Sequence, residues 1–200
     1  MTLYRLLGTA TFALALSACS LSGLLGGGGK APATLQTLTP EAPDPGPIQR
    51  AVNAGEAVTV STPTIPKELR TTRVPVQIGP TDIQYVTGLQ WVDTPDKLFR
   101  SLVEEVIRRT TSRVVLDPGQ SALDPGVVVT GQLQRFGYDA SSGQAVVVYD
   151  ASLSTEGGKR VESRRFVASE AADGTGPSVG ASLNRAANAV AADVARWVGG

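Results

Sequence analysis

The chain has 200 residues, of which 42% are hydrophobic and 18% are charged, and its 18 Lys and Arg residues balance 18 Asp and Glu residues. The charge balance excludes a nucleic-acid-binding protein that depends on excess positive charge. The hydrophobic content argues against intrinsic disorder. Because histidine is absent, a Ser-His-Asp triad, a Cys-His pair and a His-ligated metal are excluded. The single cysteine, Cys19, excludes an intramolecular disulfide.

Residues 1–18 have the layout of a bacterial signal peptide. Arg5 precedes an apolar run over residues 6–16, and this run is shorter than the roughly 20 residues that span a bilayer. The letters Leu-Ser-Ala-Cys that end at Cys19 resemble a lipobox. We therefore expect cleavage between Ala18 and Cys19, with diacylglycerol on the thiol of Cys19 and a further acyl chain on its amino group. The alternative is a secreted protein whose cysteine is incidental.

The residues after Cys19 indicate a lipidated tether followed by one domain. Ser20, rather than Asp, follows the cysteine, and by resemblance to enterobacterial sorting this predicts the periplasmic face of the outer membrane. Residues 19–33 are rich in glycine and predict a flexible tether that spans roughly 20 Å. We expect a single domain over residues 34–200, in which the proline-rich residues 34–56 are partly loose.

The first part of this domain is predicted to contain short strands. Strands are expected at residues 34–38, 58–60, 74–78 and 82–86, and a turn or short helix is expected at residues 65–69. Pro75 predicts that its strand lies at an edge of the sheet, because proline donates no ladder hydrogen bond. Gly79 and Pro80 predict a hairpin turn.

A change of hydrophobic period predicts a helix over about residues 94–112. Apolar residues recur there at intervals of three and four, namely Leu98, Phe99, Leu102, Val103, Val106 and Ile107. Thr94 is a favourable N-cap and Pro95 suits the first helical position. Glu104 and Arg108 are expected to pair on the solvent face of this helix.

The last part of the chain predicts three strands and a second helix. Strands are expected at residues 127–138, 144–155 and 159–168, joined by short glycine-containing turns. An alanine-rich apolar stripe predicts a helix over about residues 178–198. The fold class is therefore α+β, in which an antiparallel or mixed sheet packs against two amphipathic helices.

Motifs that would indicate catalysis are weak. Residues 176–180 match Gly-x-Ser-x-Gly, but a loop precedes Ser178 and no histidine exists to activate it. We favour a helix start with Ser178 as its cap, and a hydrolase that uses Ser178 is the alternative. The glycine tract before Lys30 lacks the first Gly and the final Ser or Thr of a phosphate loop. We therefore expect no enzyme, no cofactor and no metal.

Two groups of side chains have both a structural and a functional interpretation. Arg160, Arg164 and Arg165 lie on or near one predicted strand, where a solvated, edge-protecting face is favoured over a contact with anionic lipid. Trp91 and Tyr85 precede the first helix. Core packing is the favoured role for both aromatic residues, and partner binding is the alternative.

The order of these elements resembles that of the ABC-type transport auxiliary lipoproteins, the outer-membrane partners of MCE-type lipid transport systems. The features that carry the resemblance are the lipobox at Cys19, residues 35–40, residues 58–60 and 65–69, the segment in which Trp91 opens the first helix, and the terminal helix that ends in Trp197 and Val198. The resemblance extends over most of residues 34–198.

This resemblance implies a non-catalytic role at the outer membrane. The domain would dock the periplasmic MCE subunit of a phospholipid transporter, whose permease and ATPase are separate proteins. Self-association into a ring would suit partners with rotational symmetry. The alternative is an assembly factor for another envelope machine, such as a lipopolysaccharide exporter, a pilus or a secretion complex, because small α+β lipoproteins serve these machines too.

Overall fold

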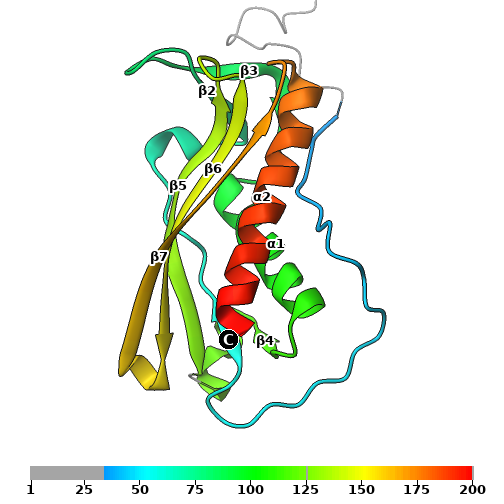
Figure 1. Ribbon diagram of the computed structural model, residues 1–200, viewed down its shortest axis with the longest axis vertical. Coiled ribbons are helices and arrows are strands. Elements are labelled where there is room, and N and C mark those ends of the chain that lie inside the picture. The colour runs from blue at the N-terminus through cyan, green and yellow to red at the C-terminus, as the bar shows by residue number, and fades with distance from the viewer. Residues whose placement is uncertain (1–33, 125, 200) are drawn as a thin grey trace, which may run out of the picture. The chain divides into compact units, whose positions relative to one another are not determined.

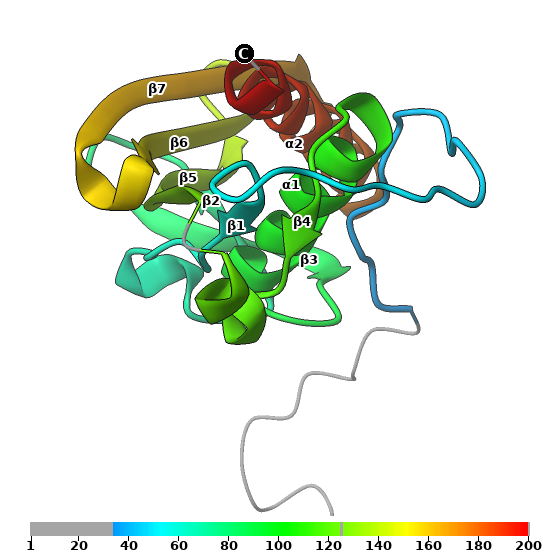
Figure 2. The ribbon, with the colours of Figure 1, turned by 90° about the horizontal axis from the view of Figure 1, so that it is seen from below.

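The computed structural model describes residues 34–124 and 126–199, which form a seven-stranded mixed sheet with two helices on one face (Figure 1, Figure 2). The strands are β1 (Val58–Val60), β2 (Arg73–Gln77), β3 (Ile83–Gln90), β4 (Val115–Leu116), β5 (Val127–Asp139), β6 (Gln144–Thr155) and β7 (Arg160–Ala171). The helices are α1 (Pro95–Thr110) and α2 (Gly176–Gly199), and short 3-10 segments are η2 (Lys67–Leu69), η3 (Pro118–Leu123) and η4 (Glu156–Gly158). The predicted α+β class is confirmed.

Strand β5 is the centre of the sheet. It pairs antiparallel with β6 along its whole length, and on its other edge it pairs parallel with β1 near its start and with β2 near its end. A register shift between Leu133 and Arg135 lets Leu133 and Phe136 both point into the core. The predicted strands from residue 127 onward are confirmed within three residues at each end.

The prediction that β2 is an edge strand is wrong. It lies between β3 and β5 in the sheet. Pro75 is tolerated there because the pairing of β2 with β5 begins only at Val76, and the register with β3 shifts between Arg73 and Pro75. The backbones are also close, since a Cβ built on Gly137 would lie 2.5 Å from the carbonyl oxygen of Pro75. The sheet therefore omits the bond that proline cannot donate.

The core lies between the helices and the inner face of the sheet. Its largest buried side chains form two edge-to-face pairs, Trp91 with Phe136 at 5.7 Å and Phe99 with Tyr149 at 5.1 Å between ring centroids. The alanines of α2 on this side are fully buried, which brings the helix close to the strands. Among the residues that the structure describes, no helix is long and apolar enough to cross a membrane.

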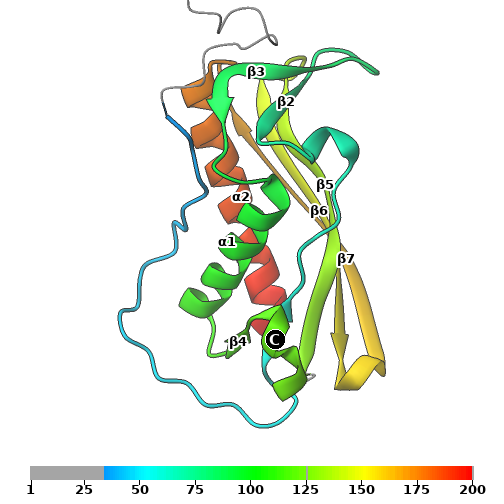
Figure 3. The ribbon, with the colours of Figure 1, turned by 180° about the vertical axis from the view of Figure 1, so that it is seen from behind.

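Residues 34–41 lie against α2, along the outer side of the helices that Figure 3 shows. The strand predicted at 34–38 is reduced to one parallel bridge between Gln36 and Trp91. The buried amide of Asn188 then receives the N–H of Glu41 at 2.8 Å and donates to the carbonyl of Thr39 at 2.9 Å. The side-chain amide of Asn188 thus makes the backbone hydrogen bonds that a neighbouring strand would otherwise make with residues 39–41.

The start of α1 differs in one detail from the prediction. Thr94 occupies the N-cap position, but its side chain makes no capping hydrogen bond. The carboxylate of Asp93 instead accepts from the backbone N–H of Thr94 at 2.7 Å and from Nζ of Lys97 at 3.0 Å. These two bonds, the backbone one first, lower the pKa of Asp93. The prediction of a threonine cap is therefore wrong in its chemistry, although the helix begins where expected.

The prediction that Glu104 lies on the solvent face is also wrong. Its side chain is only 8% exposed, and its two oxygens lie 3.8 Å from Arg100 and 3.8 Å from Arg108. Neither Oε1 of Glu104 nor Nε of Arg100 has a hydrogen-bond partner among the described residues. Burial raises the pKa of Glu104 despite the two arginines, and the nearby charge of Asp117 raises it further.

We expect Glu104→Gln to raise the free energy of unfolding at pH 8. Because the pKa of Glu104 is raised on folding, its protonated form stabilises the native state below the ordinary pKa, and this stability is lost as the pH rises through the raised value. The gain from the glutamine should therefore shrink toward pH 4. Urea unfolding at pH 8 and at pH 4 measures this difference in the free energy of unfolding between the variant and the wild type. Glu105→Gln, which removes a half-exposed partner of Arg108 and Arg109 from the same helix, is the control and should not raise the free energy of unfolding.

Candidate partner-binding surface

Strands β2 and β3 form a hairpin that presents one face outside the core. The turn closes with a hydrogen bond from the N–H of Ile78 to the carbonyl of Asp82 at 3.0 Å. The register places Pro75 opposite Tyr85 and Gln77 opposite Ile83, so these four side chains share a face. We define the hairpin surface as this face and the adjacent end of β5, namely Arg73, Pro75, Gln77, Ile83, Tyr85, Gln134 and Arg135.

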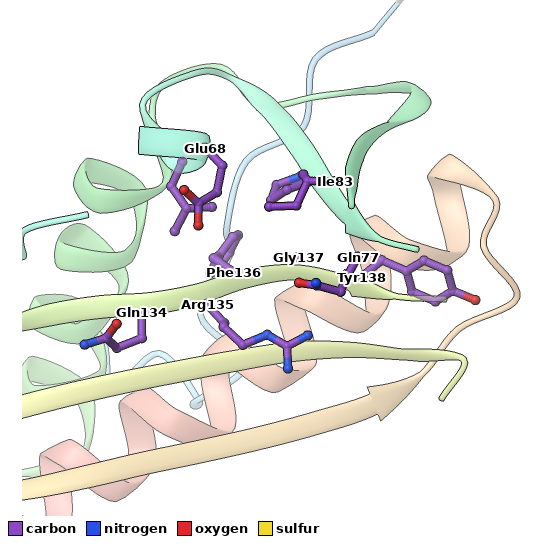
Figure 4. A pocket seen from close by; sticks show the side chains of 10 residues that line it. Glu68, Gln77, Ile83, Gln134, Arg135, Phe136, Gly137 and Tyr138 are labelled. Atoms are coloured by element: carbon purple, nitrogen blue, oxygen red, sulfur yellow. The ribbon is translucent and has the colours of Figure 1, made fainter. Parts of the chain in front are cut away.

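A small pocket of about 40 Å³ lies at the centre of the hairpin surface (Figure 4). Glu68 and Ile83 line it from the side of η2 and the hairpin, and Phe136 and Gly137 line it from β5. Pockets that hold cofactors or substrates have volumes of about 300–1,000 Å³. This pocket therefore has room for a small group, such as the tip of a partner's side chain, and not for a cofactor.

Tyr85 is held in a fixed orientation beside this pocket. The guanidinium of Arg73 lies over its ring, 4.1 Å from the centroid, and its hydroxyl donates to the carbonyl of Glu68 at 3.4 Å. Ile83 and Ile78 next to it are 44% and 46% exposed. Tyrosine and arginine are residue types enriched where proteins bind one another, and exposed apolar side chains beside them mark an interaction surface.

Arg135 on β5 is also held in place. Its guanidinium donates to Asp139 at 3.1 Å. The pKa of Asp139 falls to about 2, because the hydroxyl of Ser141 donates to the carboxylate and Arg135 does so as well. Asp139 therefore stays ionised at all physiological pH values and keeps Arg135 beside the pocket.

The structure separates the two aromatic residues singled out in the sequence. Trp91 is 1% exposed and packs on Phe136, so its ring presents no surface to a partner. Tyr85 lies on the hairpin surface. Sequence reasoning missed Ile83 and Arg135, because only the pairing of the hairpin with β5 brings them together. The exposed isoleucines that flank the Gly79–Pro80 turn are the signal that could have indicated them.

Comparison with known proteins gives the family. The sequence matches the family model described as "ABC-type transport auxiliary lipoprotein component" over residues 37–195. The chain belongs to this family. It is an auxiliary lipoprotein of ABC-type transport, and membership implies attachment to a membrane through lipid. No curated protein matches the chain.

The auxiliary lipoprotein shares its fold with solved structures of low sequence identity. The protein XCC0632 from Xanthomonas campestris has a TM-score of 0.68 and 17% identity, over 83% of this chain and 95% of that chain. A crystal structure titled as an uncharacterized protein has a TM-score of 0.62 and 14% identity, over 75% of this chain and 96% of that one. A PelC dodecamer from Paraburkholderia phytofirmans is a weaker match, with a TM-score of 0.41 and 14% identity, over 72% of this chain and 91% of that chain.

The remaining sequence-predicted sites of the auxiliary lipoprotein have different outcomes. Ala18 and Cys19 lie outside the described residues, so cleavage and lipidation stay predictions. Ser178 lies inside the first turn of α2, which begins two residues earlier than predicted, and its hydroxyl accepts from the backbone N–H of Asp173 at 3.1 Å. The prediction that Ser178 is the cap of this helix is therefore wrong. Over residues 34–124 and 126–199, no cluster of acidic or cysteine side chains is arranged as a metal site.

The three arginines of β7 do not share a face. Arg165 lies on the outer face of the sheet, where it forms two hydrogen bonds of 2.6 and 2.7 Å with Asp150 and lowers the pKa of that carboxyl. Arg160 and Arg164 lie on the opposite, helix-covered face, opposite Thr155 and Ala151 of β6. All three arginines are exposed, and among the described strands β7 pairs only with β6, so the prediction of solvated, edge-protecting side chains is confirmed. The three arginines do not form one face, because alternation along the strand separates Arg165 from the other two.

Proposed function

We propose that this auxiliary lipoprotein is a non-catalytic docking component of an MCE-type lipid transport system, anchored to the periplasmic face of the outer membrane. The observation that carries the proposal is the hairpin surface. It combines a fixed aromatic ring, the exposed Ile83 and a fixed arginine on a rigid sheet, in a member of a family of transport auxiliaries. The partner that it would contact is the periplasmic MCE subunit, and the permease and ATPase of the transporter would join through that subunit.

Site-specific photo-crosslinking tests this proposal in the native host. A benzophenone amino acid at position 83 or 85 of the full chain should crosslink to an MCE-domain protein. The same group at Val167, which is 58% exposed on the outer face of β7, is the matched control and should capture far less of it. Mass spectrometry identifies the crosslinked protein.

A substitution measures the strength of the contact. Ile83→Glu places a charge among the apolar groups of the hairpin surface, and we expect it to reduce co-purification of the MCE subunit about tenfold, which corresponds to about 1.4 kcal/mol. Val167→Glu should leave co-purification unchanged. Crosslinks at 83 and 85 to a lipopolysaccharide exporter, a pilus or a secretion complex would overturn the transport role. Capture of the MCE subunit at 167 alone would overturn the assignment of the surface.

A further inference from the structure

A second, larger cavity lies away from the hairpin surface, between β7 and the last turn of α2. Its volume is about 480 Å³, within the range of small-molecule sites. Four arginines and one carboxylate line it, namely Arg113, Arg160, Arg164, Arg196 and Glu162. We call this cavity the arginine pocket. Sequence reasoning grouped two of these arginines with Arg165, which lies on the opposite face of the strand.

Trp197 also lines the arginine pocket. Its ring packs on the buried Phe166 at 5.5 Å, and the guanidinium of Arg164 lies 5.4 Å from its centroid. Its indole N–H donates to Glu162 at 3.3 Å, and this bond, followed by the charge of Arg160, lowers the pKa of Glu162. Glu162 is therefore ionised at neutral pH and is already engaged by Trp197 and Arg160.

Positive charge exceeds negative charge in this pocket. Arg160 pairs with Glu162, and Arg196 pairs with Asp193. Arg113 donates to the backbone carbonyl of Glu56 at 3.3 Å, and Arg164 contacts the face of Trp197. The ion pairs among the described side chains include neither Arg113 nor Arg164, so within that set two positive charges of the pocket have no carboxylate within 4.0 Å. Such a concave surface with charge of one sign attracts a counter-ion.

The lining also indicates the chemical class of this counter-ion. Guanidinium groups bind phosphate through paired N–H donors, and they do so better than a point charge such as an ammonium. Val127 and Leu153 supply an apolar wall beside the arginines. We infer that the arginine pocket binds a phosphate-bearing ligand, with its phosphate between Arg113 and Arg164 and its neighbouring carbons against Trp197 and Leu153. The inference does not depend on the docking role, because the two sites share no residue.

The fluorescence of Trp197 reports binding to the full lipidated chain in a non-ionic detergent. Trp91 is buried in the core and contributes a constant signal. The probes are inorganic phosphate and dihexanoyl phosphatidylglycerol, titrated at low salt. We expect the short-chain lipid to change the emission and Arg164→Gln to weaken its binding at least tenfold. The control is Arg165→Gln on the outer face, which should alter the affinity less than twofold. Near-ultraviolet circular dichroism establishes that both variants are folded.

The outcomes separate the sources of the phosphate. If inorganic phosphate competes with the lipid and both respond to Arg164→Gln, the site recognises the phosphate group itself. If only the lipid binds and responds, the site recognises a lipid headgroup with its adjoining carbons. Tighter binding of hexaglutamate than of either probe would overturn the inference in favour of an acidic protein segment. An affinity that is equal in wild type, Arg164→Gln and Arg165→Gln would also overturn it.

Discussion

Trp91→Ala is expected to lower the free energy of unfolding by about 3–5 kcal/mol. Trp91 is one of the largest fully buried side chains, and its ring packs edge to face on Phe136 of the central strand. Its backbone also joins three segments, because its N–H donates to the carbonyl of Thr72 at 2.8 Å and the residue forms a bridge with Gln36. Removal of the ring leaves a cavity beside Phe136 in the core. Urea unfolding followed by far-ultraviolet circular dichroism measures the loss.

Trp91→Phe is the matched control for this substitution. The indole Nε1 of Trp91 is buried without a hydrogen-bond partner among the described residues, so phenylalanine removes an unpaired donor and keeps most of the apolar contact. We expect the phenylalanine variant to lose less than half of what the alanine variant loses. A loss below about 1 kcal/mol for Trp91→Ala would contradict the core position of the ring.

The long strands and helices of this chain could be predicted because the hydrophobic pattern that specifies each of them lies within its own stretch of sequence. The meander from β5 to β7 and both helices follow from alternation and from three- and four-residue spacing. The place of β2 in the sheet could not be predicted, because its pairing with β5 joins Val76 to Tyr138 across a large sequence separation. Pro75 correctly indicated a strand that lacks one ladder hydrogen bond. A register shift within the sheet accommodates that missing hydrogen bond as well as a position at the sheet edge would.

The sites were less predictable than the fold because they depend on which face each side chain occupies. Glu104 follows the helical spacing of a solvent-exposed pair, yet its side chain is buried between Arg100 and Arg108. Arg164 and Arg165 are neighbours in sequence and lie on opposite faces of β7. The arginine pocket adds Arg113 and Arg196 from two other parts of the chain, and only the tertiary structure brings them to β7.

The two proposed sites would give one chain two separate functions. The hairpin surface is built from β2, β3 and one end of β5, whereas the arginine pocket lies between β7 and the end of α2. Variants at one site should therefore leave the other intact, since substitutions far apart without shared partners act independently. Ile83→Glu should leave the Trp197 titration unchanged, and Arg164→Gln should leave capture of the MCE subunit unchanged.

Cys19→Ala is expected to abolish incorporation of labelled palmitate and to remove the chain from the outer-membrane fraction. Each buried methylene contributes about 0.8 kcal/mol to membrane affinity, and one short chain binds only marginally, so the acyl chains expected on Cys19 account for stable attachment. The folded domain begins beyond the predicted tether, and its circular dichroism spectrum should not change. Ser20→Asp is the matched control, because it keeps the cysteine and alters only the residue expected to direct sorting. On a sucrose gradient, labelled Ser20→Asp protein in the inner-membrane fraction would support the predicted sorting. Palmitate on the Cys19→Ala chain would contradict the lipobox, since the sequence contains no other cysteine.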